Sequence, residues 1–239
     1  VNPFPQEVTA QMVANFAAGG AAINQLCKAA GADLNVIALD LDRPTRDFTT
    51  TPAMEEEDCL DALQRGAAAV DTDADILLLG EMGIGTAQDW VGPGTGSDAD
   101  GMNLKARVIT AAVDKHGALS PMMRLAALGG REQAALCGAV LAARMARIPV
   151  LLDGFICTAA VTPLFAADPD LLAHCLIAHQ SREPGHRRLA EAMDKAPLLD
   201  MGMALGEGSG AALALPILKG ALACHNGMAT FAEAGISGA

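Results

Sequence analysis

Short runs of aliphatic residues constrain the fold of this chain more than any other feature. Three such runs lie at residues 36–41, 76–79 and 150–155, the last with a polar end, and longer segments with apolar residues at helical spacing separate them. Strands that are continuous aliphatic runs are typical of a parallel sheet buried on both faces. The sequence therefore predicts an α/β fold with a parallel, Rossmann-like sheet covered by helices on both faces.

The segments between these runs are predicted to be helical, because their apolar residues recur every three to four positions. They cover residues 9–30, 55–70, 105–115, 131–147, 159–178, 186–193 and 211–234. Thr9 is expected to cap the first helix, and the acidic run at residues 55–58 complements the dipole of the second. We expect one catalytic region over residues 1–239, with a small helical subdomain formed by the chain ends, residues 1–30 and 211–239.

Composition and charge exclude several classes of function. The net charge of −12 repels phosphate backbones, so nucleic acid is not an expected partner. The six cysteines form no CxxC pair, so we interpret them as reduced buried thiols. The five histidines show no paired ligand spacing, so we interpret them as surface residues or as core residues with satisfied hydrogen bonds. Because no signal peptide and no membrane-spanning run are visible, we expect a cytoplasmic protein without membrane contact.

Three glycine-bearing loops, at residues 80–85, 92–98 and 206–210, are the candidate sites of chemistry. Glycine lets backbone N–H groups approach a phosphate closely, although the first pattern is equally typical of a tight turn. Glu207 stands between two glycines in an apolar neighbourhood. A carboxylate there has a raised pKa and can act as a general base, or it supplies the negative charge that a helix N-terminus favours.

Five segments together resemble the nicotinate-nucleotide–dimethylbenzimidazole phosphoribosyltransferases. They are Phe4–Thr9, Gly80–Gly85, Leu151–Ile156, Ser181–His186 and, above all, Leu205–Ala212. The resemblance covers nearly the whole chain, and the motifs follow the order of the family. It implies transfer of the 5-phosphoribosyl group of nicotinate mononucleotide to 5,6-dimethylbenzimidazole, which gives α-ribazole 5′-phosphate and nicotinate. It also implies a homodimer that needs no metal or cofactor, since the donor is a mononucleotide and not a pyrophosphate.

The resemblance implies roles for individual residues. Glu207 matches the general base that takes a proton from the benzimidazole, Glu81 matches a second acidic residue near the ribose, and Lys105 matches a lysine near the phosphate. The residues implied to contact the substrates are Gly83, Ile84, Gly85, Gly94, Thr95, Gly96, Lys105, Asp153, Gly154, Phe155, Gly206 and Gly208.

The sequence departs from the family in three places. Family members have a longer chain before Phe4. After Gly85 they continue with Asn-Thr-Thr and a helix, whereas in this sequence Gly85 is followed directly by the segment from Thr86 to Trp90. Either a loop is deleted or its residues are omitted from the sequence. Ala204 stands where relatives often carry an arginine near the base pocket.

Other functions are open on the sequence alone. One is a non-catalytic relative that binds a nucleotide or a base, and another is a transferase with a different acceptor, such as adenine or a phenol. An NAD-dependent oxidoreductase requires a GxGxxG loop followed by an acidic residue after the next strand, and neither is present.

Overall fold

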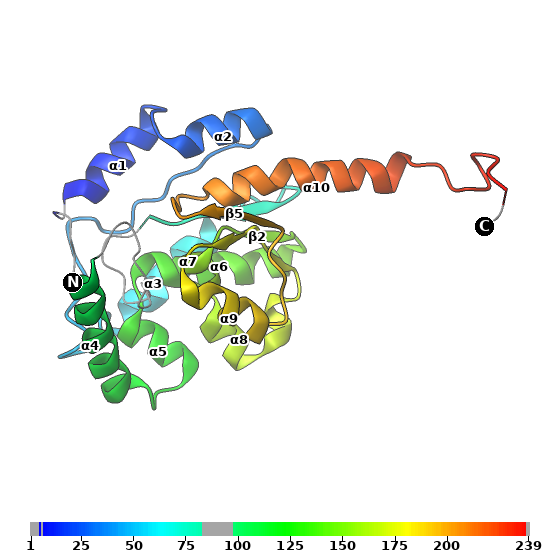
Figure 1. Ribbon diagram of the computed structural model, residues 1–239. Helices are drawn as coiled ribbons and strands as arrows, with labels where there is room; N and C mark the ends of the chain where they lie inside the picture. Colours follow the sequence, from blue (N-terminus) through cyan, green and yellow to red (C-terminus); the bar gives the residue numbers. More distant parts are fainter. Residues whose placement is uncertain (1–4, 6, 83–97, 238–239) are drawn as a thin grey trace.

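The computed structural model describes residue 5 and residues 7–82 and 98–237, and these form an α/β architecture (Figure 1). Every strand pairing among the described residues is parallel. One sheet has the order β1-β2-β3 and a second has the order β4-β5. The strands are β1 (Leu77–Leu79), β2 (Val150–Leu152), β3 (Cys175–Ile177), β4 (His179–Ser181) and β5 (Leu199–Met203).

The two sheets are continuous at Ala178, the residue between β3 and β4. Its N–H donates to the carbonyl oxygen of Leu152 (2.7 Å), and its carbonyl oxygen accepts from the N–H of Leu199 (3.0 Å). The same stretch of chain therefore borders β2 on one side and β5 on the other. Since all strands run the same way, the carboxyl ends of β1, β2 and β5 face the same end of the molecule.

Helices follow or precede each strand. They are α1 (Glu7–Ala17), α2 (Ala22–Ala30), α3 (Glu56–Ala68), α4 (Ala99–His116), α5 (Pro121–Leu128), α6 (Arg131–Ala146), α7 (Phe155–Ala160), α8 (Thr162–Ala167), the 3₁₀-helix η1 (Pro169–Leu172), α9 (Pro184–Ala192) and α10 (Ser209–Gly227). The expected acidic residues do lie in the first turn of α3.

Both faces of the sheet are covered, as the sequence predicts. Val150 and Leu152 of β2 point into the main core, which α3 and α6 complete. Leu151, between them, packs against Ala211 and Ala214 of α10 on the opposite face. Because strand side chains alternate between faces, a strand that is buried on both must be apolar throughout. The predicted fold class is confirmed.

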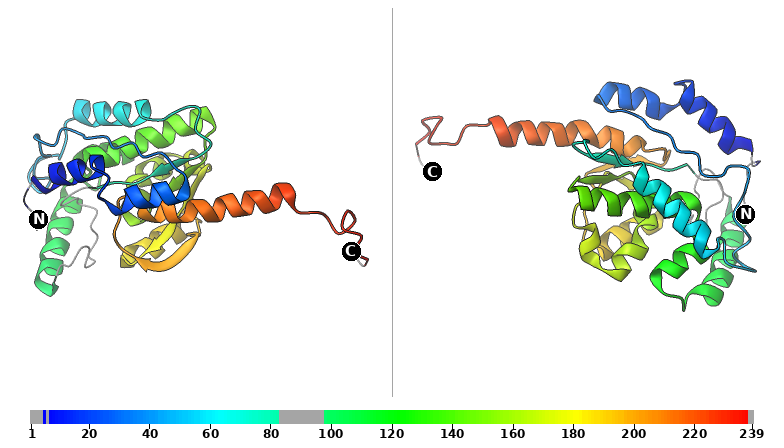
Figure 2. Two further views of the ribbon diagram at one scale, coloured as in Figure 1. Left: turned by 90° about the horizontal axis from the view of Figure 1, so that it is seen from above. Right: turned by 180° about the vertical axis from the view of Figure 1, so that it is seen from behind.

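The two ends of the chain meet on the α10 face. Phe16, Ile23 and Cys27 form an apolar cluster with Ala212 of α10. The Lys219 ammonium of α10 donates to the carbonyl oxygen of Ala30, at the end of α2 (2.7 Å). Figure 2 shows α2 beside the first half of α10, whose second half extends beyond the body of the molecule. None of the described helices is long and apolar enough to cross a membrane.

The predicted strand at residues 36–41 is wrong. Residues 32–40 have no regular structure, and the side chains of Val36 and Ile37 are 39% and 43% exposed. No strand of the described chain lies beside this segment to complete its hydrogen bonds; instead, the guanidinium of Arg65 donates to the carbonyl oxygen of Ala38 (2.6 Å). An aliphatic run becomes a strand only where a neighbour pairs with it.

Three predicted helices differ from the structure, and the last of them, expected over residues 211–234, ends at Gly227. The helix expected over residues 9–30 is divided into α1 and α2, because Gly19 takes a left-handed φ of +77°, and Thr9 lies inside α1 instead of capping it. The segment 159–178 is helical only in part, since its last residues form β3. A short apolar run does not distinguish a buried helix from a buried strand.

Candidate active site

The ends of β1 and β2 and the loop before α10 meet at one edge of the sheet. Glu81 follows β1, Asp153 follows β2, and Glu207 precedes α10. The N–H of Glu207 donates to the carbonyl oxygen of Glu81 (3.3 Å). The N–H of Asp153 donates to the carbonyl oxygen of Leu79 (3.0 Å). The fold thus brings the two predicted catalytic glutamates together, although they are far apart in the sequence. In parallel sheets this edge is where ligands bind.

The loop that carries Glu207 has an unusual backbone. Gly206, Glu207 and Gly208 have φ angles of +78°, +62° and +81°. The left-handed conformation costs a residue with a side chain about 1–2 kcal/mol, whereas glycine adopts it freely. The two glycines therefore allow the chain to turn sharply on both sides of Glu207, and the surrounding contacts must offset the strain at Glu207 itself.

The same loop lies directly against the end of β1. A Cβ atom placed on Gly80 would lie 2.4 Å from the backbone nitrogen of Gly208 and 2.5 Å from its Cα. Backbone therefore contacts backbone here, and any side chain at position 80 would push the Glu207 loop away.

Asp153 holds the start of α10. Its side chain is buried, its Oδ2 accepts from the N–H of Gly208 (3.2 Å), and its Oδ1 accepts from the N–H of Ala211 (2.9 Å). The N-cap residue of α10 is Gly208, which has no side chain of its own. The Asp153 carboxylate therefore caps this helix from the end of β2, where the helix dipole also favours a negative charge.

His179 fills the space beneath this cap. Its side chain is 2% exposed, and its Nε2 lies 3.7 Å from Oδ1 of Asp153. A Cβ atom on Gly154 would lie 2.5 Å from the ring, and one on Gly210 would lie 1.9 Å from it. The imidazole is thus clamped between the end of β2 and the first turn of α10. Sequence reasoning missed His179, because a lone histidine in a short polar strand has no distinctive spacing.

Burial and neighbouring charges raise the pKa values of the carboxyl groups of the site. Burial, and then the negative charge of Asp153, raise the pKa of Glu207, in agreement with the sequence-based expectation. Burial also raises the pKa of Asp153, against the opposing effect of His179 and the backbone N–H groups. The pKa of Cys157 is raised well above its ordinary value by burial and by the charges of Asp153 and Glu81. This thiol donates to the carbonyl oxygen of Leu79 (3.4 Å) and is no nucleophile.

A buried chain of hydrogen bonds supports the floor of the site. The Nδ1 atom of His186 accepts from the N–H of Ser181 (2.9 Å), so its Nε2 carries the proton toward Oγ1 of Thr158 (3.1 Å). The Thr158 hydroxyl donates to the carbonyl oxygen of Gly154 (2.8 Å). Burial and His179 lower the pKa of His186 to about 4, which keeps the ring neutral. Phe155 packs on this ring, with centroids 5.9 Å apart.

The remaining predicted site residues fall into three groups. Gly83, Ile84, Gly85, Gly94, Thr95 and Gly96 lie outside the described residues. Gly154 and Phe155 are buried beneath the site. Lys105 is half-buried in the second turn of α4, and its role toward a phosphate stays a prediction. The exposed Ala204 lies between β5 and Gly206.

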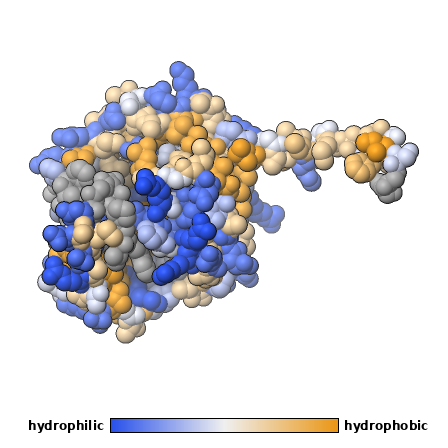
Figure 3. Space-filling model, viewed as in Figure 1, coloured by the Kyte–Doolittle hydropathy of each residue, from blue (hydrophilic) through white to orange (hydrophobic). Residues whose placement is uncertain are grey.

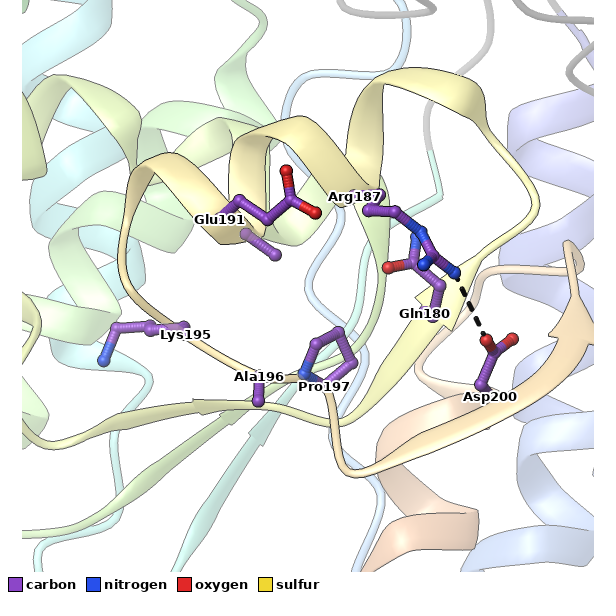
Figure 4. A pocket seen from close by; sticks show the side chains of 8 residues that line it. Gln180, Arg187, Glu191, Lys195, Ala196, Pro197 and Asp200 are labelled. Atoms are coloured by element: carbon purple, nitrogen blue, oxygen red, sulfur yellow. Dashed lines mark ion pairs between the residues drawn. The ribbon is translucent and has the colours of Figure 1, made fainter.

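A cavity of about 280 Å³ lies elsewhere, between α9 and the start of β5 (Figure 4). Arg187 and Asp200 on its wall form an ion pair (3.6 Å), and the Lys195 ammonium donates to the carbonyl oxygen of Cys175 (2.7 Å). No predicted site residue lines this cavity. Within the described ranges, no three His, Cys, Asp or Glu side chains are grouped as metal ligands.

Comparisons with known proteins give a consistent picture. Residues 1–236 match a family model described as phosphoribosyltransferase. A nicotinate-nucleotide–dimethylbenzimidazole phosphoribosyltransferase of Rhodobacter capsulatus is 60% identical, and a protein of the same name from a Ruegeria species is 56% identical. Each alignment spans 99% of this chain and 75% of the relative. Both run over 252 positions, more than the 239 residues of this chain, so the relatives carry residues within the matched region that this chain lacks.

Solved structures agree. The crystal structure of CobT from Thermus thermophilus superposes with a TM-score of 0.88 at 36% identity. The superposition covers 100% of this chain and 82% of the other.

Proposed function

Because this chain belongs to the phosphoribosyltransferase family, we propose that it transfers the 5-phosphoribosyl group of nicotinate mononucleotide to 5,6-dimethylbenzimidazole. The observation that carries the proposal is the position of Glu207. This glutamate has a raised pKa, lies beside Glu81 at the carboxyl edge of the parallel sheet, and is held in a strained loop. A general base with a pKa closer to the working pH transfers protons more effectively.

The reaction follows from this arrangement. One ring nitrogen of the benzimidazole attacks C1′ of the ribose, and the bond between C1′ and the nicotinate nitrogen breaks, with its electron pair leaving on nicotinate. Glu207 accepts the proton from the other benzimidazole nitrogen. Attack opposite to the leaving group inverts C1′ and gives the α-ribotide. The carboxylate of Glu81 stabilises the positive charge that develops on the ribose in the transition state.

A direct assay tests this function. The protein is mixed with nicotinate mononucleotide and dimethylbenzimidazole, and nicotinate and α-ribazole 5′-phosphate are followed by chromatography and mass spectrometry. Parallel reactions contain adenine, a phenol or no acceptor. We expect both products only with the benzimidazole. Intact nucleotide binding without α-ribazole phosphate would contradict the proposal and would direct attention to the other acceptors or to a binding-only relative.

The proposed enzyme works in the cytoplasm, since its cysteines are free thiols and such thiols persist in a reducing compartment. Five of the six are buried as the sequence predicts, whereas Cys224 is exposed. The contact of α2 with α10 supports the further proposal that the chain ends, residues 1–30 and 211–239, form a small helical subdomain within one catalytic region, residues 1–239.

We also propose a homodimer. The second half of α10 extends from the body (Figure 3), and the side chains of Ile217 and Leu222 on it are 56% and 59% exposed. Met228 and Phe231, which follow the helix, are exposed as well. Several exposed apolar side chains on one projecting segment favour a protein–protein interface, and a second copy of the same chain is the occupant that we propose.

A further inference from the structure

We propose that Asp153 is a positioning residue that holds the Glu207 loop in its catalytic conformation, and that it does not contact the substrates. This inference rests on the proposed function, because it assigns a task to Asp153 through the general base of that reaction. It replaces the substrate contact that the family resemblance implies for Asp153 with a contact inside the protein.

The hydrogen bonds of Asp153 carry the argument. Both carboxylate oxygens are engaged by backbone N–H groups, Oδ2 by Gly208 (3.2 Å) and Oδ1 by Ala211 (2.9 Å). Gly208 is the residue directly after Glu207. A fixed Gly208, together with the bond from the N–H of Glu207 to Glu81 (3.3 Å), restrains the general base from both sides.

Among the residues that the structure describes, the neighbours of Asp153 bury its carboxylate. Its side chain is 4% exposed, and Nε2 of His179 lies 3.7 Å from Oδ1. Gly80, which follows β1, lies in direct backbone contact with Gly208 of the Glu207 loop. The carboxylate therefore acts through the backbone that it holds, and this contact offsets the strain of the left-handed conformation at Glu207.

The charge of Asp153 has a second effect. Among the described residues, the titratable groups around the Glu207 loop are Asp153 after β2, Glu81 after β1, His179 in β4 and Cys157 in α7. The Asp153 carboxylate raises the pKa of Glu207. Neutralising Asp153 therefore lowers the pKa of Glu207, so the acid limb of the kcat profile moves to lower pH, because the base stays deprotonated further into acid.

The test is the Asp153→Asn variant of the full chain. Asparagine keeps the shape, but its amide offers one acceptor oxygen to two N–H groups, so the loop shifts. Since a displacement of about 1 Å can reduce turnover roughly 100-fold, we expect kcat to fall by about 100-fold. We expect the Kd for nicotinate mononucleotide to stay within about threefold, because no substrate contact is lost. The acid limb of kcat moves to lower pH.

Two further variants isolate the effect. Asp153→Asn combined with Glu207→Gln should be no slower than Glu207→Gln alone, because Asp153 acts through Glu207. Asp168→Asn is the matched control: Asp168 also caps a helix, accepting from the N–H of Asp170 (3.0 Å), but it is exposed and belongs to η1. Its kcat and pH profile should be those of the wild type. If Asp153→Asn does not fold, the smaller Asp153→Ser enters the same assays.

Three results would overturn the proposal. An increase of more than about tenfold in the nucleotide Kd with kcat retained would make Asp153 a substrate contact. A lower Tm with unchanged kcat and pH profile would make it a structural residue only. A double variant much slower than Glu207→Gln would show an action that does not pass through Glu207. An inactive wild type would instead refute the proposed function, so the two failures are distinguishable.

Discussion

Glu207 carries a side chain in a backbone conformation that glycine usually occupies, with φ at +62°. Such strain persists only where neighbouring contacts fix it. Here those contacts come from Gly80 and Glu81 at the end of β1 and from Asp153 at the end of β2. At the scale of single residues, the conformation of Glu207 is therefore set by the contacts around its backbone rather than by the intrinsic backbone preference of glutamate.

Changing Glu207 to Gln should remove the general base and leave the fold intact. We expect kcat to fall by about 100-fold or more, since general base catalysis contributes roughly 10²–10⁴-fold, with the Kd for nicotinate mononucleotide little changed. In the wild type, kcat should rise with pH through a pKa above the ordinary value for glutamate, because burial and Asp153 raise it. Steady-state kinetics at saturating substrates across the pH range measure the kcat of the Gln variant and the pH dependence of the wild-type kcat. Wild-type turnover in the Gln variant would remove Glu207 from the mechanism.

Changing Gly80 to Ala should displace the Glu207 loop, because the new Cβ would lie 2.4 Å from the backbone nitrogen of Gly208. We expect kcat to fall by about tenfold or more, given the steep dependence of turnover on geometry. Gly220→Ala is the matched control, since a Cβ atom there meets nothing within 4 Å. Equal kinetics for the two variants would show that the close contact is unimportant.

At the scale of elements, α10 links the chain ends to the site. Its first turn is capped by Asp153, and Ala212, at the end of that turn, packs with Ile23 of α2. A Cβ atom on Gly208 would lie 3.5 Å from Cδ1 of Ile23, so α2 also backs the Glu207 loop. Packing of α2 therefore stabilises the same loop that the strand ends position.

Changing Ile23 to Ala should test this packing. The side chain is buried, and truncation of a buried isoleucine costs about 2–5 kcal/mol of unfolding free energy. Denaturant unfolding followed by circular dichroism measures the loss. The exposed Ile37 provides the comparison, since its truncation should change stability by less than about 1 kcal/mol. Similar losses at both positions would contradict the packing of α2 on α10.

The sequence predicts the strands that are covered on both faces. Residues 76–79 and 150–152 are aliphatic because both faces of β1 and β2 are covered, and the resulting aliphatic runs predict these two strands. β4 and β5 were not predicted, because their segments mix polar residues and glycine with apolar ones. The Glu207 loop was found through its glycines and family motif. Asp153 as a helix cap was not, because its partners at positions 208 and 211 are close only in the folded chain.

At the scale of the whole molecule, the second half of α10 is the feature that stands apart from the body of the described chain. It projects away from the sheet in every view (Figures 1 and 2). Pro216 lies where the buried half ends and the exposed half begins. One helix thus contributes to the site at its first turn and offers an apolar surface at its other end.

Changing Leu222 to Asp should weaken the proposed dimer, because a charge on an apolar interface is not paired. Sedimentation velocity over a range of protein concentrations should show the wild type as a dimer and the variant shifted toward the monomer. Met145→Asp is the control, since Met145 is also exposed and apolar but belongs to α6. A monomeric wild type, or equal shifts for both variants, would contradict α10 as the interface.

The contact between Gly80 and Gly208 also orders events in time. A ribosome adds Gly208 long after β1 has emerged, and α10 is the last helix of the described chain to be made. The carboxylate at position 207 can be fixed only after this final helix has docked on a sheet formed earlier, and such long-range contacts form slowly. Catalytic competence therefore arises late in folding, so the appearance of activity marks the docking of α10 on the sheet.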